Sequence, residues 1–161
     1  MCTKRKSSEN RMIEGDLIEL AKFGRFDVII HGCNCFCNMN AGFAKSIKFN
    51  FPEAYLADAQ TIKGEKEKLG NYTTVTIQRN GFKFTIVNAY TQYYYGGSGV
   101  KVDYEAIKNI FKKIKKNYSG KRIAYPLIGA GLAGGNWSII ENIINNQLKG
   151  EHHTAVKYRQ D

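Results

Sequence analysis

The chain has 161 residues, of which 43% are hydrophobic and 12% aromatic, a composition that fits one compact domain with its own core. Its apolar runs are far shorter than the roughly 20 residues that cross a bilayer, and no basic-then-apolar leader opens the sequence. We therefore expect a soluble, cytoplasmic protein without membrane contacts. Twenty-four Lys and Arg against 14 Asp and Glu give a formal charge of +10, which favours anionic partners.

Two segments carry part of this positive excess. Residues 1–11 (MCTKRKSSENR) show no periodicity and indicate a flexible N-terminal arm, which leaves 12–161 as a single domain. Residues 112–116 (KKIKK) lie on a helical pattern. We interpret them as a solvated helix face, and a nucleic-acid patch is the less favoured alternative.

In the first half of the chain, a short strand at 12–13 precedes a brief amphipathic helix at 17–23, which Asp16 can cap. Residues 27–31 (DVIIH) are apolar and β-branched, as in a strand buried on both faces. A helix begins near Ala41, pauses at 51–53 (FPE) and resumes through 54–62, because Pro52 is tolerated in a first turn.

The second half opens with a hairpin, since the alternating segments 73–79 and 82–90 are joined by Asn80-Gly81. Helices are expected at 104–118 and 137–148. Two more strands are expected, a buried one at 122–128 and a closing one at 154–158. Strands that alternate with helices and include one hairpin predict an α/β fold, with a mixed sheet covered by helices on both faces.

Three cysteines alternate with His31 in the pattern HxCxCxC, at positions 33, 35 and 37. Same-face neighbours on a strand lie about 7 Å apart, too far for one zinc ion with bonds of about 2.3 Å to its thiolates. Disulfides between such close neighbours are equally disfavoured. We expect free thiols that pack as small apolar groups, with no metal and no cofactor.

Glycine-rich loops stand out at 31–42, 93–99 and 128–136, and the first and last follow buried strands and lead into helices. Ligands of open α/β sheets bind at such carboxyl ends, where glycines let backbone N–H groups approach an anion. The loops therefore predict a cleft for a phosphate-containing ligand. Gly129, Gly131 and Gly134 also match GxGxxG, but too little chain follows for a full dinucleotide-binding domain.

In four segments the sequence resembles the macro domain, a family that binds ADP-ribose. The segments are GDL at 15–17, IIHGCNCFCNMNAGFA at 29–44, NAYTQYYYGG at 88–97 and YPLIGAGLAGGNW at 125–137. Their order and spacing are more specific than any single glycine motif. The resemblance covers roughly 12–158 and implies a three-layer α/β/α fold with a mixed sheet of about six strands.

The resemblance also implies which residues bind ADP-ribose. Asp16, followed by Leu17, would accept a hydrogen bond from the adenine amino group, unless it is only a helix cap. Asn34 would contact the distal ribose. Tyr95 or a neighbouring tyrosine would cover the pocket, unless it is only an exposed loop aromatic. The distal ribose and the diphosphate would be lined by Asn40, Ala41, Gly42, Phe43 and Ala44. The diphosphate would also be wrapped by the backbone amides of Gly129, Ala130, Gly131 and Leu132.

Within the family, the sequence is most similar to small phosphatase-type members of phages, bacteria and yeast, which hydrolyse ADP-ribose 1″-phosphate. Those members carry a histidine in the first loop, matched by His31, and an aspartate before the tryptophan of the last loop, where this chain has Asn136. An amide cannot act as a general base, so Asn136 weakens the case for catalysis. Asn40 replaces a usual glycine and either narrows the pocket or adds a polar contact.

We therefore expect a monomer that binds ADP-ribose or ADP-ribose 1″-phosphate, with His31, Asn34 and Asn136 as the candidate catalytic residues. His31 can alternatively be a structural histidine at the end of its strand. Two other functions remain, a module that binds ADP-ribose without turnover and a hydrolase that removes ADP-ribose from proteins. The lysine nucleophile of one related branch has no evident equivalent near 88–92.

Overall fold

One mixed sheet of six strands organises residues 11–159, the part of the chain that the computed structural model describes. The strand order is β1-β6-β5-β2-β4-β3, and neighbouring strands are parallel except for the antiparallel pair β3 and β4. The strands are β1 (Arg11–Gly15), β2 (Val28–Cys33), β3 (Tyr72–Arg79), β4 (Phe82–Tyr90), β5 (Ile123–Tyr125) and β6 (His153–Tyr158).

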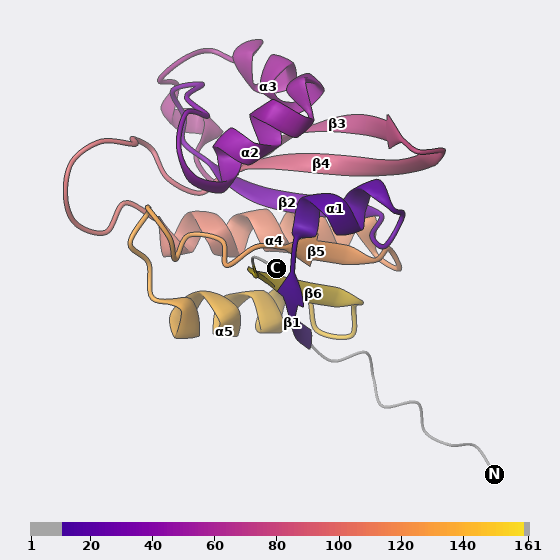
Figure 1. Cartoon of the computed structure of the whole chain (residues 1–161). Helices are drawn as coiled ribbons and strands as arrows, with labels where there is room; N and C mark the ends of the chain where they lie inside the picture. The colour runs from indigo at the N-terminus through magenta and orange to yellow at the C-terminus, as the bar shows by residue number, and fades with distance from the viewer. Residues whose placement is uncertain (1–10, 160–161) are drawn as a thin grey trace.

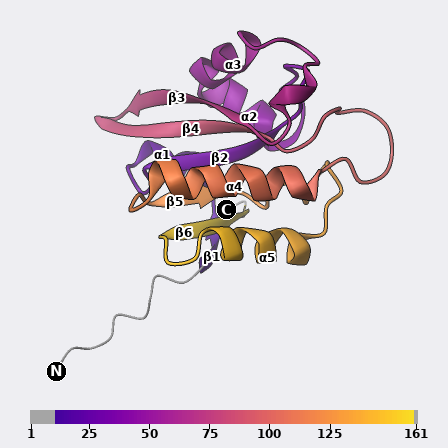
Figure 2. The ribbon, with the colours of Figure 1, turned by 180° about the vertical axis from the view of Figure 1, so that it is seen from behind.

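Helices cover both faces of this sheet (Figure 1). On one face lie α1 (Leu17–Lys22), α2 (Gly42–Asn50) and α3 (Pro52–Ala59), and a short 3-10 helix, η1 (Lys66–Lys68), follows α3. On the other face lie α4 (Tyr104–Tyr118) and α5 (Trp137–Gln147), as the view from behind shows (Figure 2). The predicted three-layer α/β/α fold with a six-stranded mixed sheet is confirmed.

Buried residues of alternating orientation explain why the sheet needs helices on both sides. Along β2, Val28 and Ile30 belong to the core beneath α4 and α5, whereas Ile29 belongs to the core beneath α1, α2 and α3. All three side chains are at most 2% exposed. A central strand with apolar residues on both faces is stable only when both faces are covered.

Local sequence signals fix the element ends. Asn80 (φ 52°) and Gly81 (φ 80°) both adopt the positive φ of a two-residue hairpin turn. Pro52 stands in the first turn of α3, as expected. The strand expected at 122–128 is shorter, because Pro126 has no N–H to continue the parallel ladder after Tyr125. The predicted arm at 1–11 lies outside the described residues except for Arg11, which begins β1.

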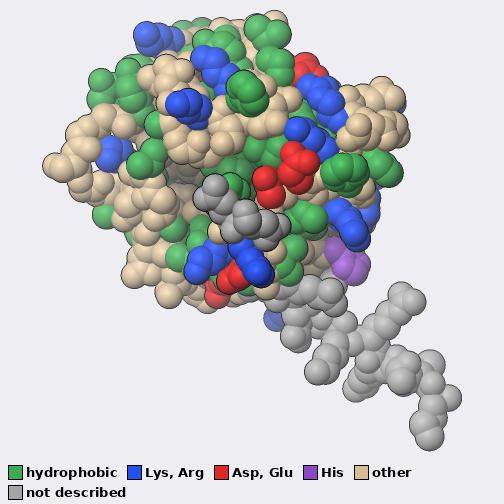
Figure 3. All heavy atoms as spheres, in the orientation of Figure 1, with side chains coloured by type: hydrophobic (Ala, Val, Ile, Leu, Met, Phe, Trp, Pro, Cys, Tyr) green, Lys and Arg blue, Asp and Glu red, His purple; other side chains and the backbone are tan. Residues whose placement is uncertain are grey.

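The parallel strands bring their carboxyl ends to the same edge of the sheet, so the segments that follow β2, β4 and β5 are neighbours there. Lys and Arg side chains are scattered over the face seen in Figure 3, between apolar and acidic groups. Within residues 11–159, no helix is long and apolar enough to span a bilayer.

Candidate functional site

A cavity of about 430 Å³ opens at this carboxyl edge, between the segment after β2 and the segment after β5. The two glycine loops thus share one hollow, as the sequence predicts. The lining is largely apolar and backbone-rich, which suits a ligand held by main-chain groups. The residues that line it are Gly32, Cys33, Asn34, Asn38, Ala41, Gly42, Phe43, Ala44, Thr91, Gln92, Tyr95, Pro126, Leu127, Ile128, Gly129, Gly131, Leu132 and Ala133.

The N-terminus of α2 forms one wall of the cavity. Its cap residue, Ala41, has no side-chain oxygen, so the N–H groups of the first turn receive no side-chain cap. The first turn also carries no acidic residue. Uncapped N–H groups at the positive end of a helix dipole bind anions, and here Ala41 to Ala44 line the cavity.

The loop after β5 forms the facing wall. Gly129 has a φ of +76°, and a Cβ there would lie 2.8 Å from Val102 Cγ2, so both backbone conformation and space require glycine. Gly131 has neither constraint, because an added Cβ meets nothing within 4 Å. Leu132 reaches across to the first wall, where a Cβ on Gly42 would lie 3.1 Å from its Cδ1. Ala130 is not among the lining residues.

Asn34 is buried at the base of the first wall and fixes its own loop. Its Oδ1 accepts hydrogen bonds from the N–H groups of Phe36 (2.9 Å) and Asn38 (3.4 Å), and its Nδ2 donates to the Asn38 carbonyl (2.7 Å). One N–H of the Asn34 amide is not used by these bonds. The side chain therefore holds the loop and can still offer a donor to the cavity.

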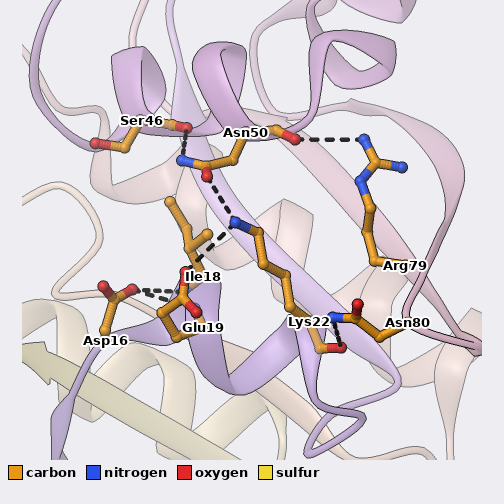
Figure 4. A network of polar contacts seen from close by, with 8 residues as sticks. All are labelled: Asp16, Ile18, Glu19, Lys22, Ser46, Asn50, Arg79 and Asn80. Atoms are coloured by element: carbon orange, nitrogen blue, oxygen red, sulfur yellow. Dashed lines mark hydrogen bonds and ion pairs between the residues drawn. The ribbon is translucent and has the colours of Figure 1, made fainter.

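Asp16 is the N-cap of α1, where its Oδ1 accepts from the N–H groups of Ile18 (3.0 Å) and Glu19 (3.2 Å). Figure 4 shows this cap beside the hydrogen bond that Lys22 of α1 donates to Asn50 at the end of α2 (2.8 Å). Asp16 and the buried Leu17 follow β1 at the same sheet edge, but neither lines the cavity. Both cap bonds end on Oδ1, so the capping role does not involve Oδ2.

Two asparagines lie away from the cavity lining. Asn136 is the N-cap of α5, and its Oδ1 accepts from the N–H groups of Ser138 and Ile139. Asn40 is exposed and is not among the residues with positive φ. Its Oδ1 accepts from Lys48 Nζ at 3.3 Å, so this side chain does not narrow the pocket.

His31 is also placed differently from its predicted role. Its ring is completely buried, lies 6.3 Å from the Phe43 ring and bonds through Nε2 to Asn88 Oδ1 at 2.7 Å. Burial lowers the pKa of His31 to about 4, although the Asn88 bond acts in the opposite direction. His31 does not line the cavity, and its burial and its bond to Asn88 agree with the alternative prediction of a structural histidine.

An aromatic group borders the cavity. Tyr95 lines it and is 44% exposed, and its ring lies 4.7 Å from that of Tyr94. Phe36 contacts the rings of Tyr93, Tyr94 and Tyr95 in edge-on geometry. Tyr95 is thus placed where it can cover a ligand.

Two cysteines of the first loop donate hydrogen bonds to carbonyl groups of other segments. The Cys35 thiol donates to the Gln92 carbonyl (3.5 Å), and the Cys37 thiol donates to the Asp58 carbonyl (3.3 Å). Burial raises the pKa of Cys33 well above its usual value and that of Cys35 to about 11, so both stay thiols at neutral pH. Among residues 11–159, no group of three or more His, Cys, Asp or Glu side chains is arranged to hold a metal ion.

Sequence reasoning missed several residues of this site. Thr91 and Gln92 follow β4 and line the cavity, and the Thr91 hydroxyl is buried without a hydrogen-bond partner among the described residues. Beneath the first loop lies a buried polar group formed by Lys68, Asp58 and Tyr90, in which the Tyr90 hydroxyl donates to Asp58 Oδ1 at 2.8 Å. Burial raises the pKa of both Asp58 and Tyr90.

Comparison with known families matches residues 30–144 of this chain to the model of the macro domain. The chain belongs to the macro-domain family. It is 35% identical over 140 residues to an uncharacterized 17.5 kDa protein of Enterobacteria phage T4, from the tk-vs intergenic region. The alignment covers 84% of this chain and 87% of the phage protein.

Solved structures share the macro-domain fold. A protein of unknown function from Bacteroides thetaiotaomicron superposes with a TM-score of 0.75 at 25% identity, over 94% of this chain and 99% of that one. DarTG of Thermosipho africanus, solved in complex with ADP-ribose, superposes with a TM-score of 0.73 at 18% identity. The matched region covers 94% of this chain and 42% of the DarTG chain.

Proposed function

We propose that this macro domain binds ADP-ribose in the cavity at the carboxyl edge of its sheet. The observation that carries the proposal is the shared hollow between the uncapped N-terminus of α2 and the glycine loop at 129–133. Two sets of backbone N–H groups that face one hollow suit a diphosphate, which carries charge on several oxygens. The T. africanus protein of the same fold was solved with ADP-ribose, which agrees with this choice.

The other parts of the ligand follow from the order of residues around the cavity. The distal ribose lies near Asn34, whose amide retains one free N–H, and Tyr95 covers the ligand from the loop after β4. The adenine extends along the sheet edge toward Asp16, whose Oδ2 is not needed for the helix cap. A carboxylate oxygen in that place accepts a hydrogen bond from an exocyclic amino group.

Titration calorimetry with ADP-ribose tests the proposal directly, and the absence of heat at high micromolar ligand would refute it. A sharper test uses Gly131→Asp, because this position has room for a side chain and no left-handed backbone. A carboxylate beside the diphosphate should lower affinity by about tenfold or more through like-charge repulsion. Gly131→Asn, of equal shape but uncharged, is the matched control. Equal affinity of the two variants would place the diphosphate elsewhere.

A finer proposal concerns the substrate, which we take to be ADP-ribose 1″-phosphate, hydrolysed to ADP-ribose and phosphate. It rests on the resemblance to phosphatase-type members, and Lys48 supports it by carrying a positive charge to Asn40 beside the start of α2. The described residues that line the cavity include no imidazole, carboxylate or amine, so turnover has to rely on groups that orient the phosphate and water. Phosphate released in excess over protein supports the enzyme, whereas binding without release establishes a non-catalytic module.

A further inference from the structure

Lys68 is buried, with 8% of its surface exposed, although lysine is among the side chains most often found in solvent. Its ammonium group donates to the Cys35 carbonyl at 3.0 Å, to Thr61 Oγ1 at 2.6 Å and to the Ile62 carbonyl at 3.3 Å. With Cys37 Sγ at 3.7 Å as a fourth, weaker acceptor, these contacts occupy all three of its donors. The ammonium also lies 4.8 Å from the centroid of the Tyr90 ring.

The first of these acceptors belongs to the loop that forms the cavity wall. Cys35 directly follows Asn34, and its carbonyl also accepts from the Gly64 N–H at 2.7 Å. Two residues further on, Cys37 holds a left-handed conformation (φ 55°) with its sulfur 3.7 Å from the Lys68 ammonium. Lys68 is itself absent from the cavity lining, so it contacts the loop from behind.

Stability alone does not account for this lysine. Burying an ammonium group costs more than burying an apolar side chain of similar size, and the nearby charge of Asp58 offsets only part of that cost. Replacing a buried charge pair as a whole by apolar groups is often neutral or stabilising, whereas removing one partner alone is strongly destabilising. A charged group with three donors instead fixes the position of the loop, because its hydrogen bonds connect Cys35 of the loop to Thr61 and Ile62 of the segment after α3.

We propose that Lys68 is a positioning residue that holds the loop at 34–38 in the form that presents Asn34 to the distal ribose of the ligand. This inference rests on the proposed function and goes further, since it assigns to a residue outside the cavity the preference for ADP-ribose over ADP. ADP lacks the distal ribose. Loosening the loop should therefore weaken ADP-ribose binding and leave ADP, held by the α2 N-terminus and the 129–133 loop, largely unaffected.

Lys68→Met tests the proposal, because methionine fills most of the lysine stem and removes the donors. We expect its affinity for ADP-ribose to fall by about tenfold, the scale of one lost charge-assisted hydrogen bond, while its affinity for ADP changes by less than about twofold. Lys63→Met, at an exposed lysine of the same segment, is the matched control and should change neither affinity. Lys68→Arg, which keeps the charge and the donors, should retain part of the ADP-ribose affinity that Lys68→Met loses.

A milder variant, Thr61→Val, keeps the side-chain shape and covers the case in which Lys68→Met does not fold. It removes one Lys68 acceptor together with the bond that the Thr61 hydroxyl donates to the Asp58 carbonyl at 2.6 Å. It should show a smaller loss for ADP-ribose and none for ADP. Equal losses for both ligands in either folded variant would identify a general structural role and overturn the proposal, and so would unchanged binding of both. A wild-type protein that binds neither ligand would refute the proposed function itself, and a wild type that binds both equally would refute only the role of Lys68.

Discussion

Acid should destabilise this protein through His31, a group that stays neutral in the folded state. The unfolded chain protonates a histidine below its ordinary pKa of 6.5, whereas burial lowers the pKa of folded His31 to about 4. Below pH 6.5 the unfolded state therefore binds more protons, and the free energy of unfolding falls as the pH falls. Above pH 6.5 both states are neutral and His31 contributes no pH dependence.

The size of the effect follows from the same two values. Between 6.5 and about 4 lie 2.5 pH units, each worth about 1.4 kcal/mol, so His31 alone removes about 3 kcal/mol of stability by pH 4. That is a large part of the 5–15 kcal/mol typical of a folded domain. Burial also lowers the pKa of His153, which adds to the loss, and raises that of Asp58, which opposes it.

A comparison with His31→Gln isolates the contribution of His31. The glutamine amide can still donate to Asn88 Oδ1 but does not titrate. Urea unfolding is measured from pH 7 to pH 4.5 by fluorescence of the single tryptophan, Trp137, and by circular dichroism. Below pH 6.5, the wild type should lose about 1.4 kcal/mol of stability per pH unit relative to the variant. A difference that is constant with pH would refute the reasoning.

Three further predictions test individual positions. Asn136→Asp should keep the cap of α5 and raise the melting temperature slightly in differential scanning fluorimetry, since a carboxylate suits a helix N-terminus; a clear drop would contradict its role as a cap. Asp16→Ala should lower stability by about 1 kcal/mol in urea titrations and, if Oδ2 binds adenine, remove discrimination between ADP-ribose and its inosine analogue. Gly129→Ala should destabilise the fold, whereas Gly131→Ala should leave its melting temperature unchanged.

The elements of this fold could be predicted wherever a periodic pattern or a turn signal was strong. The hairpin at Asn80-Gly81, the helix start at Pro52 and the cap at Asp16 each depend on local chemistry, so the sequence alone was sufficient. The strand at 122–128 was predicted too long because apolar residues continue beyond the ladder. Leu127 and Ile128 leave the sheet after Pro126 and line the cavity instead.

Which side chains reach the cavity was harder to predict, because that depends on the face of each strand. His31 and Gly32 are neighbours, yet the histidine side chain points toward α2, whereas Gly32 lines the cavity and leaves it open because it has no side chain. A Cβ at Gly32 would lie 2.8 Å from Thr91 Oγ1. A motif match transfers residue types along the chain, but the alternation of faces along a strand decides which of them meets a ligand.

The buried group beneath the first loop shows the same limit more strongly. Residues 63–68 (KGEKEK) carry so many charges that the whole segment predicts an exposed turn, and Lys63 and Lys66 are indeed exposed. Lys68 differs from them only through its acceptors, which include Cys35, 33 residues away in the chain. Only folding brings these groups together, since a lysine becomes buried where carbonyl oxygens from distant segments converge to replace its water. The residue that we expect to set ligand preference is therefore the one that its local sequence identifies least well.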